Sequence, residues 1–256
     1  MSRIERVFED RNKKALIGYV TVGFPNIEST LKIVPLLVEN GCDIIELGIP
    51  FSDPLADGPV IQKSSYEALQ QGVTTEKCIE VAIQLRKTID VPLVFMGYYN
   101  PVLHYGPDRF CKDSAAAGID GFIIPDLPPE EGVELESIAQ TYGIDLIYLL
   151  APTSGDDRIS IVAEKSQGFV YLVSLTGVTG SGTELPPELE EFVKRVRQKT
   201  SKPLCVGFGI TNPEQARRVA SVADGIIVGS RFIKLIEEDP SLSSLQSLVQ
   251  SLKTAL

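Results

Sequence analysis

The chain has 256 residues, of which 43% are hydrophobic and 23% are charged, and its formal net charge is -10. This composition is typical of a globular protein with one large core. It excludes nucleic acid and an anionic membrane surface as expected partners, because both require basic patches, so any phosphate site must be built locally from backbone N–H groups.

The cysteines are widely spaced and form no CxxC pair, so we expect small core residues in a reducing compartment: Cys42, Cys78, Cys111 and Cys205. The N-terminal segment is charged throughout and lacks the apolar core of a signal peptide. No apolar run is long enough to span a bilayer. The expected location is the cytoplasm, or an organelle stroma after import.

The first elements alternate between helical and strand patterns. Apolar side chains at helical spacing in residues 2–13 predict an amphipathic N-terminal helix, and the apolar run 15–22 predicts a strand. Asn26 is the expected N-cap of a helix that runs to about Asn40, where a glycine supplies the stop.

The second predicted strand carries a carboxylate within an apolar run. Alternation places Ile44, Glu46 and Gly48 on one face, and we expect the glycine to leave space for a ligand. A buried carboxylate needs a partner, a raised pKa or a role in chemistry. Asp57 follows in a loop that could fold back over the same site, and two acids with separately tuned pKa values can move protons on and off a substrate. Alternatively, Glu46 pairs with a buried Lys or Arg and Asp57 only shapes a turn.

The remaining chain continues the alternation. The patterns predict helices over 59–72, 75–88, 130–142, 155–166 and 242–252. They predict strands over 91–96, 118–124, 143–150, 168–173, 203–208 and 224–228.

Eight strand–helix units in this length favour a closed (β/α)8 barrel over an open doubly wound sheet. We expect a single TIM-barrel domain over residues 1–256, with an extra N-terminal helix and a short helix after strand 8. Closure would gather all loops that follow strands at the C-terminal mouth of the barrel.

Glycines follow the last three predicted strands. Gly180 lies after strand 6, Gly209 after strand 7, and Gly229 with Ser230 after strand 8, where a short helix over 231–237 begins. In such barrels these loops and the free N–H groups of the short helix often hold a phosphate. The alternative is that they are ordinary turn residues.

Two further features have two interpretations each. The loop 177–183, which contains Thr179, could be a lid that closes over a ligand, or a solvated linker. Tyr171 could orient Glu46 or contact the ligand, or be a core residue with a satisfied hydroxyl. The single histidine, His104, lies outside the strand pattern and is not expected to be catalytic. No metal site is predicted, and only an oxygen-ligated metal is left open.

Several segments, in order along nearly the whole chain, resemble the tryptophan synthase α subunit family. The most specific is Glu46-Leu-Gly-Ile-Pro-Phe-Ser-Asp-Pro-Leu-Ala-Asp57-Gly-Pro. Supporting matches are Gly18-Tyr-Val-Thr-Val-Gly, Met96-Gly-Tyr-Tyr-Asn100-Pro, Pro125-Asp-Leu-Pro, Tyr171-Leu-Val-Ser, Gly177-Val-Thr-Gly180, Gly207-Phe-Gly-Ile and Val228-Gly-Ser.

The resemblance implies cleavage of indole-3-glycerol phosphate to indole and glyceraldehyde 3-phosphate. It implies Glu46 and Asp57 as catalytic acids, with Tyr171 assisting. Phosphate would bind to the backbone around Gly180, Gly209, Gly229 and Ser230. It also implies no cofactor in this chain and a pyridoxal-phosphate β subunit as partner, in an α2β2 heterotetramer.

The chemistry of this retro-aldol cleavage agrees with the two-acid pattern. Glu46 would protonate the indole ring at C3 and take the glycerol hydroxyl proton as the C–C bond breaks, if an apolar site raises its pKa. Asp57 would stay ionised and accept the indole N–H.

Two loops at the mouth, 51–58 and 99–103, would order against the β subunit and give low activity alone with strong stimulation by the partner. Their expected interface residues are Asp53, Pro54 and Asn100. Three alternatives stay open: a self-sufficient indole-glycerol-phosphate lyase, a binding and activating module with a silent site, and another phosphate-binding barrel such as an isomerase.

Overall fold

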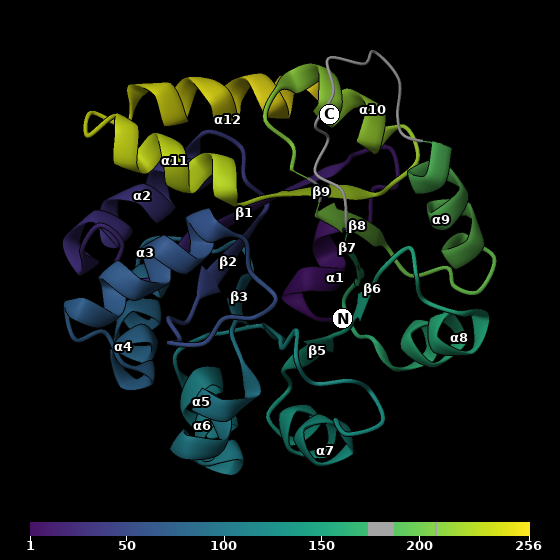
Figure 1. The fold of residues 1–256 in the computed structure, drawn as a ribbon, viewed down its shortest axis with the longest axis horizontal. Helices are drawn as coiled ribbons and strands as arrows, with labels where there is room; N and C mark the ends of the chain where they lie inside the picture. Colours follow the sequence, from purple (N-terminus) through teal and green to yellow (C-terminus); the bar gives the residue numbers. More distant parts are fainter. Residues whose placement is uncertain (174–186, 208) are drawn as a thin grey trace.

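The protein is built around one parallel sheet that is rolled into a barrel (Figure 1). A computed structural model describes residues 1–173, 187–207 and 209–256. The strands are β1 (Ala15–Thr21), β2 (Ile44–Gly48), β3 (Leu93–Met96), β4 (Gly121–Ile123), β5 (Asp145–Ile147), β6 (Leu149–Leu150), β7 (Val170–Val173), β8 (Leu204–Gly207) and β9 (Gly225–Val228). Their order in the sheet is β5-β4-β3-β2-β1-β9-β8-β7-β6, with every pairing parallel.

The two ends of this order belong to one stretch of chain, which closes the barrel. β5 pairs with β4, and β6 pairs with β7. A single residue, Tyr148, separates β5 from β6. Between them, the carbonyl of Tyr148 accepts a hydrogen bond from the N–H of Tyr171 at 3.1 Å. The predicted (β/α)8 barrel is therefore confirmed, with the fifth predicted strand interrupted at Tyr148.

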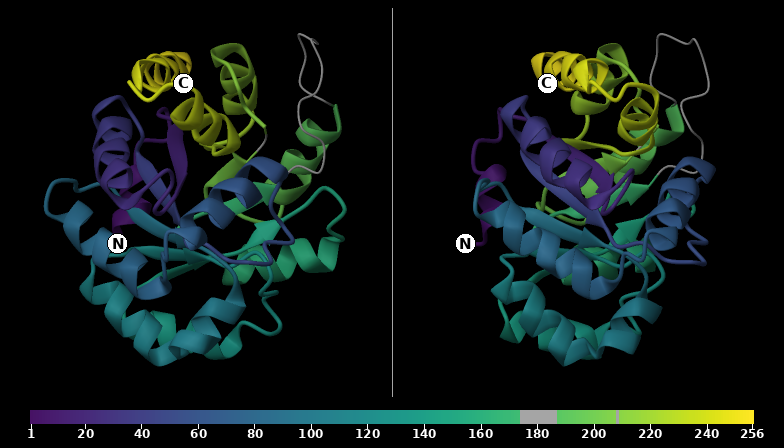
Figure 2. Two further views of the ribbon diagram at one scale, coloured as in Figure 1. Left: turned by 60° about the vertical axis from the view of Figure 1, so that its left-hand side comes forward. Right: turned by 90° about the vertical axis from the view of Figure 1, so that its left-hand side faces the viewer.

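Helices surround the strands on all sides (Figure 2). They are α1 (Arg3–Val7), α2 (Ile27–Glu39), α3 (Pro59–Gln70), α4 (Thr75–Arg86), α5 (Tyr99–Tyr105), α6 (Pro107–Ala116), α7 (Val133–Thr141), α8 (Asp156–Lys165), α9 (Pro187–Arg197), α10 (Pro213–Ala220), α11 (Ser230–Glu238) and α12 (Ser243–Ala255). The predicted N-cap Asn26 is confirmed, since its side chain accepts a hydrogen bond from the N–H of Ser29. The described helices include none with both the length and the apolar character needed to cross a membrane.

The N-terminal helix is shorter than predicted. It spans Arg3–Val7 instead of residues 2–13, and it begins with a capping box between Ser2 and Glu5. After it, the Asp10 side chain accepts a hydrogen bond from the N–H of Asn12, and the Asp10 carbonyl accepts one from Lys13. Such local bonds of an Asp compete with the helical ladder, which explains why the helix does not continue.

Helix α1 covers the N-terminal end of the barrel. Ile4 is fully buried in the cluster of side chains that fills the barrel, and the ring of Phe8 lies 6.1 Å from that of Phe169. The rest of that inner cluster comes from alternate strand positions, including Ile17, Ile44 and Val94. A second, larger cluster packs the outer faces of the strands against the helices.

Aspartates that directly precede strands tie neighbouring strands together at this same end. Asp43 accepts a hydrogen bond from the N–H of Leu16 at 2.7 Å, Asp120 from Leu93 at 2.9 Å and Asp224 from Leu204 at 2.8 Å. Each aspartate is also paired with at least one Lys or Arg. The N-terminal end of the barrel is therefore fixed by charged hydrogen bonds.

Asp120 is the most buried of the three, and it contacts Arg3 at 2.5 Å and Arg86 at 2.9 Å. We expect Asp120→Ala to lower the free energy of unfolding by roughly 3–5 kcal/mol, because it leaves the half-buried Arg86 unpaired and the Leu93 N–H without an acceptor. Urea unfolding followed by circular dichroism measures this. The control is Asp90→Ala: Asp90 also pairs with Arg3, at 3.4 Å, but its side chain is 98% exposed, so its loss should be close to neutral. Equal effects of the two variants would contradict the assignment.

Candidate active site

The carboxyl group of Glu46 is buried. The residue lies in the middle of β2 with 0% of its surface exposed, and neither carboxyl oxygen has a hydrogen-bond partner among the described residues. Burial in this apolar setting raises the pKa of Glu46 to about 8. Of the two sequence interpretations, the buried ion pair with Lys or Arg is not found among the described residues.

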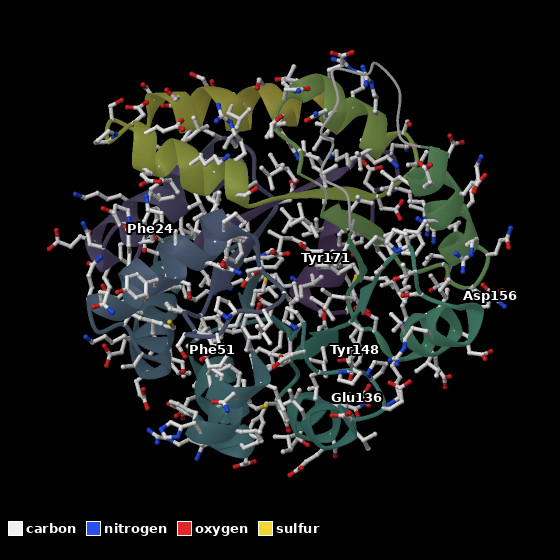
Figure 3. All side chains as sticks on the ribbon, viewed as in Figure 1. Phe24, Phe51, Glu136, Tyr148, Asp156 and Tyr171 are labelled. Atoms are coloured by element: carbon white, nitrogen blue, oxygen red, sulfur yellow. The ribbon has the colours of Figure 1, made fainter. Side chains whose placement is uncertain are left out.

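Glu46 faces the interior of the barrel rather than the outer helices. Its charge is one of the causes that raise the pKa values of Tyr19, Tyr171 and Cys205, for each of which burial is the largest cause. These three residues lie on β1, β7 and β8, and both Tyr171 and Cys205 belong to the cluster inside the barrel. Tyr171 lies near the centre of the ring of strands in Figure 3. The acid and the predicted assisting tyrosine are thus in one interior environment.

The space beside Gly48 is filled by a tyrosine, so the prediction that it is left for a ligand was wrong. A Cβ atom on Gly48 would lie 2.2 Å from the hydroxyl of Tyr19, on the neighbouring strand. Similarly, a Cβ on Gly207 would lie 2.4 Å from the hydroxyl of Tyr171. Both glycines are required for close approach of an aromatic ring.

The sequence analysis did not predict Tyr19 as a residue of the site. It faces the same side of β1 as Ile17 and lies opposite Glu46 in the register of β1 and β2. Its hydroxyl lies 3.3 Å from that of Thr21, which is 2.7 Å from that of Ser64 on α3. The strand is thereby linked to the helix that follows the Asp57 loop.

Asp57 is held over the mouth by a tyrosine from the next loop. Its Oδ2 accepts a hydrogen bond from the hydroxyl of Tyr98 at 3.0 Å, and the same hydroxyl accepts one from the N–H of Ala56 at 2.9 Å. Burial raises the pKa of Asp57, and the hydrogen bond from Tyr98 acts in the opposite direction. Asp57 also raises the pKa values of Tyr19 and Tyr171, behind burial as the main cause, which places it above the same interior group as Glu46.

The loop that carries Asp57 is fixed at both ends and protrudes in the middle. At its start, Phe51 exchanges two hydrogen bonds with the hydroxyl of Ser65, at 2.9 and 3.0 Å, and its ring lies 5.3 Å from that of Tyr98 (labelled Phe51 in Figure 3). Leu55 is 92% exposed. The predicted interface residues Asp53 and Asn100 are exposed and Pro54 is half-buried.

The loops after β8 and β9 meet at the same mouth. Ser230 opens α11, directly after Gly229, and no side chain that the structure describes caps this helix, so its first N–H groups are available to an anion. A cavity of about 300 Å³ beside it is lined by Thr211, Ser230, Arg231 and Lys234. Gly209, in the first of these loops, is exposed and has a φ of +35°, which favours glycine. The cations Arg231 and Lys234 were not singled out in the sequence, although both lie one helical turn apart on the predicted short helix.

Two predicted site residues fall outside the part of the chain that the structure describes, and two other predictions concern a histidine and a metal site. Thr179 and Gly180, the proposed lid and phosphate residues, lie outside the described residues. His104 is exposed on α5. Within the described ranges, no three His, Cys, Asp or Glu side chains are grouped so that they could hold a metal ion.

Both the sequence and the fold of the chain match known proteins. A family model described as tryptophan synthase alpha chain matches residues 6–255. The chain is 57% identical to the tryptophan synthase alpha chain of Dehalococcoides mccartyi over 256 residues, covering 100% of both chains, and 47% identical to that of Geotalea uraniireducens, covering 100% of this chain and 98% of the other.

The fold is also similar to solved structures of tryptophan synthase. The tryptophan synthase subunit alpha of Legionella pneumophila has a TM-score of 0.92 at 38% identity and covers 100% of this chain and 98% of that chain. A chain of tryptophan synthase from M. tuberculosis has a TM-score of 0.91 at 36% identity, covering 100% and 99%. Because the sequence matches extend over essentially the whole chain, this protein belongs to the tryptophan synthase alpha chain family.

Proposed function

We propose that this chain uses Glu46 and Asp57 to carry out the reaction of its family, the lyase cleavage of indole-3-glycerol phosphate to indole and glyceraldehyde 3-phosphate. The observation that carries the proposal is the buried carboxyl of Glu46, which no described residue hydrogen-bonds. With a pKa near 8 it is protonated at neutral pH and can act as an acid. Its location beside Tyr171 supports an assisting role for that tyrosine.

The proton transfers balance within the site. Glu46 donates its proton to C3 of the indole ring, and the ring becomes an electron sink. The carboxylate then removes the proton of the glycerol hydroxyl, the C–C bond breaks, and its electrons return to the ring. Glu46 ends protonated as it began, so no other acid or base is consumed.

Asp57 supplies the charge that this path requires. The indole N–H donates to its carboxylate, which stabilises the positive charge that grows on the protonated ring. The hydrogen bond from Tyr98 favours the ionised form of Asp57 and fixes its position. The phosphate of the substrate would bind the backbone at Gly209, Gly229 and Ser230, together with Gly180, which lies outside the described residues.

The partner follows from the family. An alpha chain implies a β subunit, and we propose an α2β2 heterotetramer in which the β subunit holds pyridoxal phosphate and receives indole. The protruding Leu55 and Leu103, which is 52% exposed on α5, support docking at the mouth beside Asp53, Pro54 and Asn100. The acidic charge of the chain and the absence of a membrane-spanning helix from its described part are consistent with a cytoplasmic location, which we propose.

We expect Glu46→Gln to lower the rate of indole release by roughly 10²–10⁴-fold or more, because glutamine has a similar shape but cannot exchange the proton. A spectrophotometric indole assay measures the rate, and binding of glycerol 3-phosphate should persist. The matched control is Glu131→Gln, which makes the same change at an exposed position in the loop after β4. Indole release by Glu46→Gln at the rate of the control would refute the assignment.

The role of Asp57 is tested with its hydrogen-bond donor. Asp57→Asn should lower kcat/KM by roughly 10²–10³-fold, whereas Tyr98→Phe should lower it by no more than about tenfold, because it removes the hydroxyl's hydrogen bonds with Asp57 and Ala56 but leaves the carboxylate in place. Tyr98 lowers the pKa of Asp57, so its loss raises that pKa, and the acidic limb of the pH profile of kcat/KM should move to higher pH. A near-normal rate for Asp57→Asn would remove its electrostatic role.

The docking surface is tested by adding charge to it. Leu103→Lys should weaken stimulation of indole release by a tryptophan synthase β subunit at least about tenfold, while the rate of the isolated chain stays unchanged. Ile83→Lys is the control, since Ile83 is 44% exposed in the second half of α4, away from the C-terminal strand ends that form the mouth. If the isolated chain already reaches the full rate, or both variants respond equally to the partner, docking at this mouth is contradicted.

A further inference from the structure

A cavity of about 720 Å³ opens at the end of the barrel opposite the candidate active site. Its walls come from the segment after α1 and from the segments that lead into β1, β8 and β9. Since all strands are parallel, the segments before them gather at the N-terminal end. In the right-hand view of Figure 2 the N-terminus lies at this end, and the β2–α3 loop with Asp57 lies at the other.

The walls of this cavity are strongly basic. Five cationic side chains line it against a single carboxylate: Arg11, Lys13, Lys14, Arg197 and Lys199 against Asp224. The whole chain carries a net charge of -10, so this concentration of positive charge is opposite to the character of the remaining surface. A concave surface lined by one sign of charge focuses its field and raises the local concentration of counter-ions.

The carboxylate does not neutralise this charge, because it is already fully engaged. Asp224 accepts hydrogen bonds from Arg197 and from the N–H of Leu204, and Lys14 lies 3.9 Å away. These contacts belong to the structural ties at the N-terminal end of the barrel. The remaining cations of the wall, Arg11, Lys13 and Lys199, do not pair with Asp224.

Arg11 and Lys199 are the uncommitted charges. Neither side chain makes an ion pair or a hydrogen bond within the described part of the chain, and both are exposed. Lys13 has only a 3.7 Å contact with Asp10 on the rim, with both side chains half or more exposed. A planar guanidinium such as that of Arg11 offers paired donors that match a phosphate or carboxylate group.

We propose that this cavity is a binding site for a small polyanion, a molecule that carries several phosphate or carboxylate groups. The volume lies within the range of about 300–1,000 Å³ that is usual for small-molecule sites, and the two uncommitted cations, Arg11 and Lys199, favour a ligand with more than one negative charge. Arg11 and Lys199 contact the ligand directly, and Lys13 adds to the field. The site is separate from the phosphate cradle at Ser230 and does not depend on the reaction catalysed there.

Isothermal titration calorimetry at low ionic strength tests the proposal on the full chain, with tripolyphosphate and citrate as probes. Glycerol 3-phosphate is present in excess, so that the cradle at the C-terminal mouth is filled. We expect one saturable site per chain for at least one probe, and the better probe identifies phosphate or carboxylate as the preferred group. No saturable binding of either probe at millimolar concentration would overturn the proposal.

A charge-matched pair of variants locates the site. Arg11→Glu/Lys199→Glu should weaken probe binding roughly tenfold or more. Lys87→Glu/Lys112→Glu makes the same change in net charge at exposed positions at the end of α4 and on α6, neither of which lines the cavity, and should weaken it less than about twofold. Circular dichroism and an unchanged rate of indole release verify that both pairs are folded. An equal loss in both pairs would mean a diffuse charge effect, and the proposal would be wrong.

Discussion

The carboxyl group of Glu46 is buried inside the barrel, and no group in the described part of the chain binds it. Burial raises its pKa to about 8, compared with 4.5 for an ordinary glutamate. Between these two values the folded chain holds a proton that the unfolded chain has released. The free energy of unfolding therefore falls as the pH rises from 4.5 toward 8. A group that lowers stability in this way fits the role of catalytic acid that we propose for Glu46.

The two ends of the barrel divide the work between stability and chemistry. At the N-terminal end, α1 and the aspartates before β2, β4 and β9 fix the strands with charged hydrogen bonds. At the C-terminal end, the loops place Asp57 above the barrel and the free N–H groups of α11 beside it. The interior between them is closely packed, because rings such as that of Tyr19 reach into the spaces left by glycines. Burial in this interior raises the pKa of Glu46.

The sequence predicted the parts that local patterns determine. Alternation of apolar runs gave the eight units of the barrel, the burial of Glu46 and the helix that opens at Ser230. Contacts between residues distant in the chain were not predictable in this way. The ring of Tyr19 fills the space at Gly48 from the neighbouring strand, and Tyr98 holds Asp57 from 41 residues further along. The N-terminal helix was predicted too long because hydrophobic spacing does not register the competing bonds of Asp10.

Burial keeps Glu46 protonated at neutral pH, and the pKa of its carboxyl group can be measured directly. Carbon NMR of the side-chain carboxyl, in protein labelled at glutamate and assigned by comparison with Glu46→Gln, follows the titration of this one group. We expect a midpoint near pH 8 in the isolated chain. A midpoint close to 4.5, the ordinary value for glutamate, would show that the carboxyl is solvated or paired, and Glu46 would then not be an acid at neutral pH.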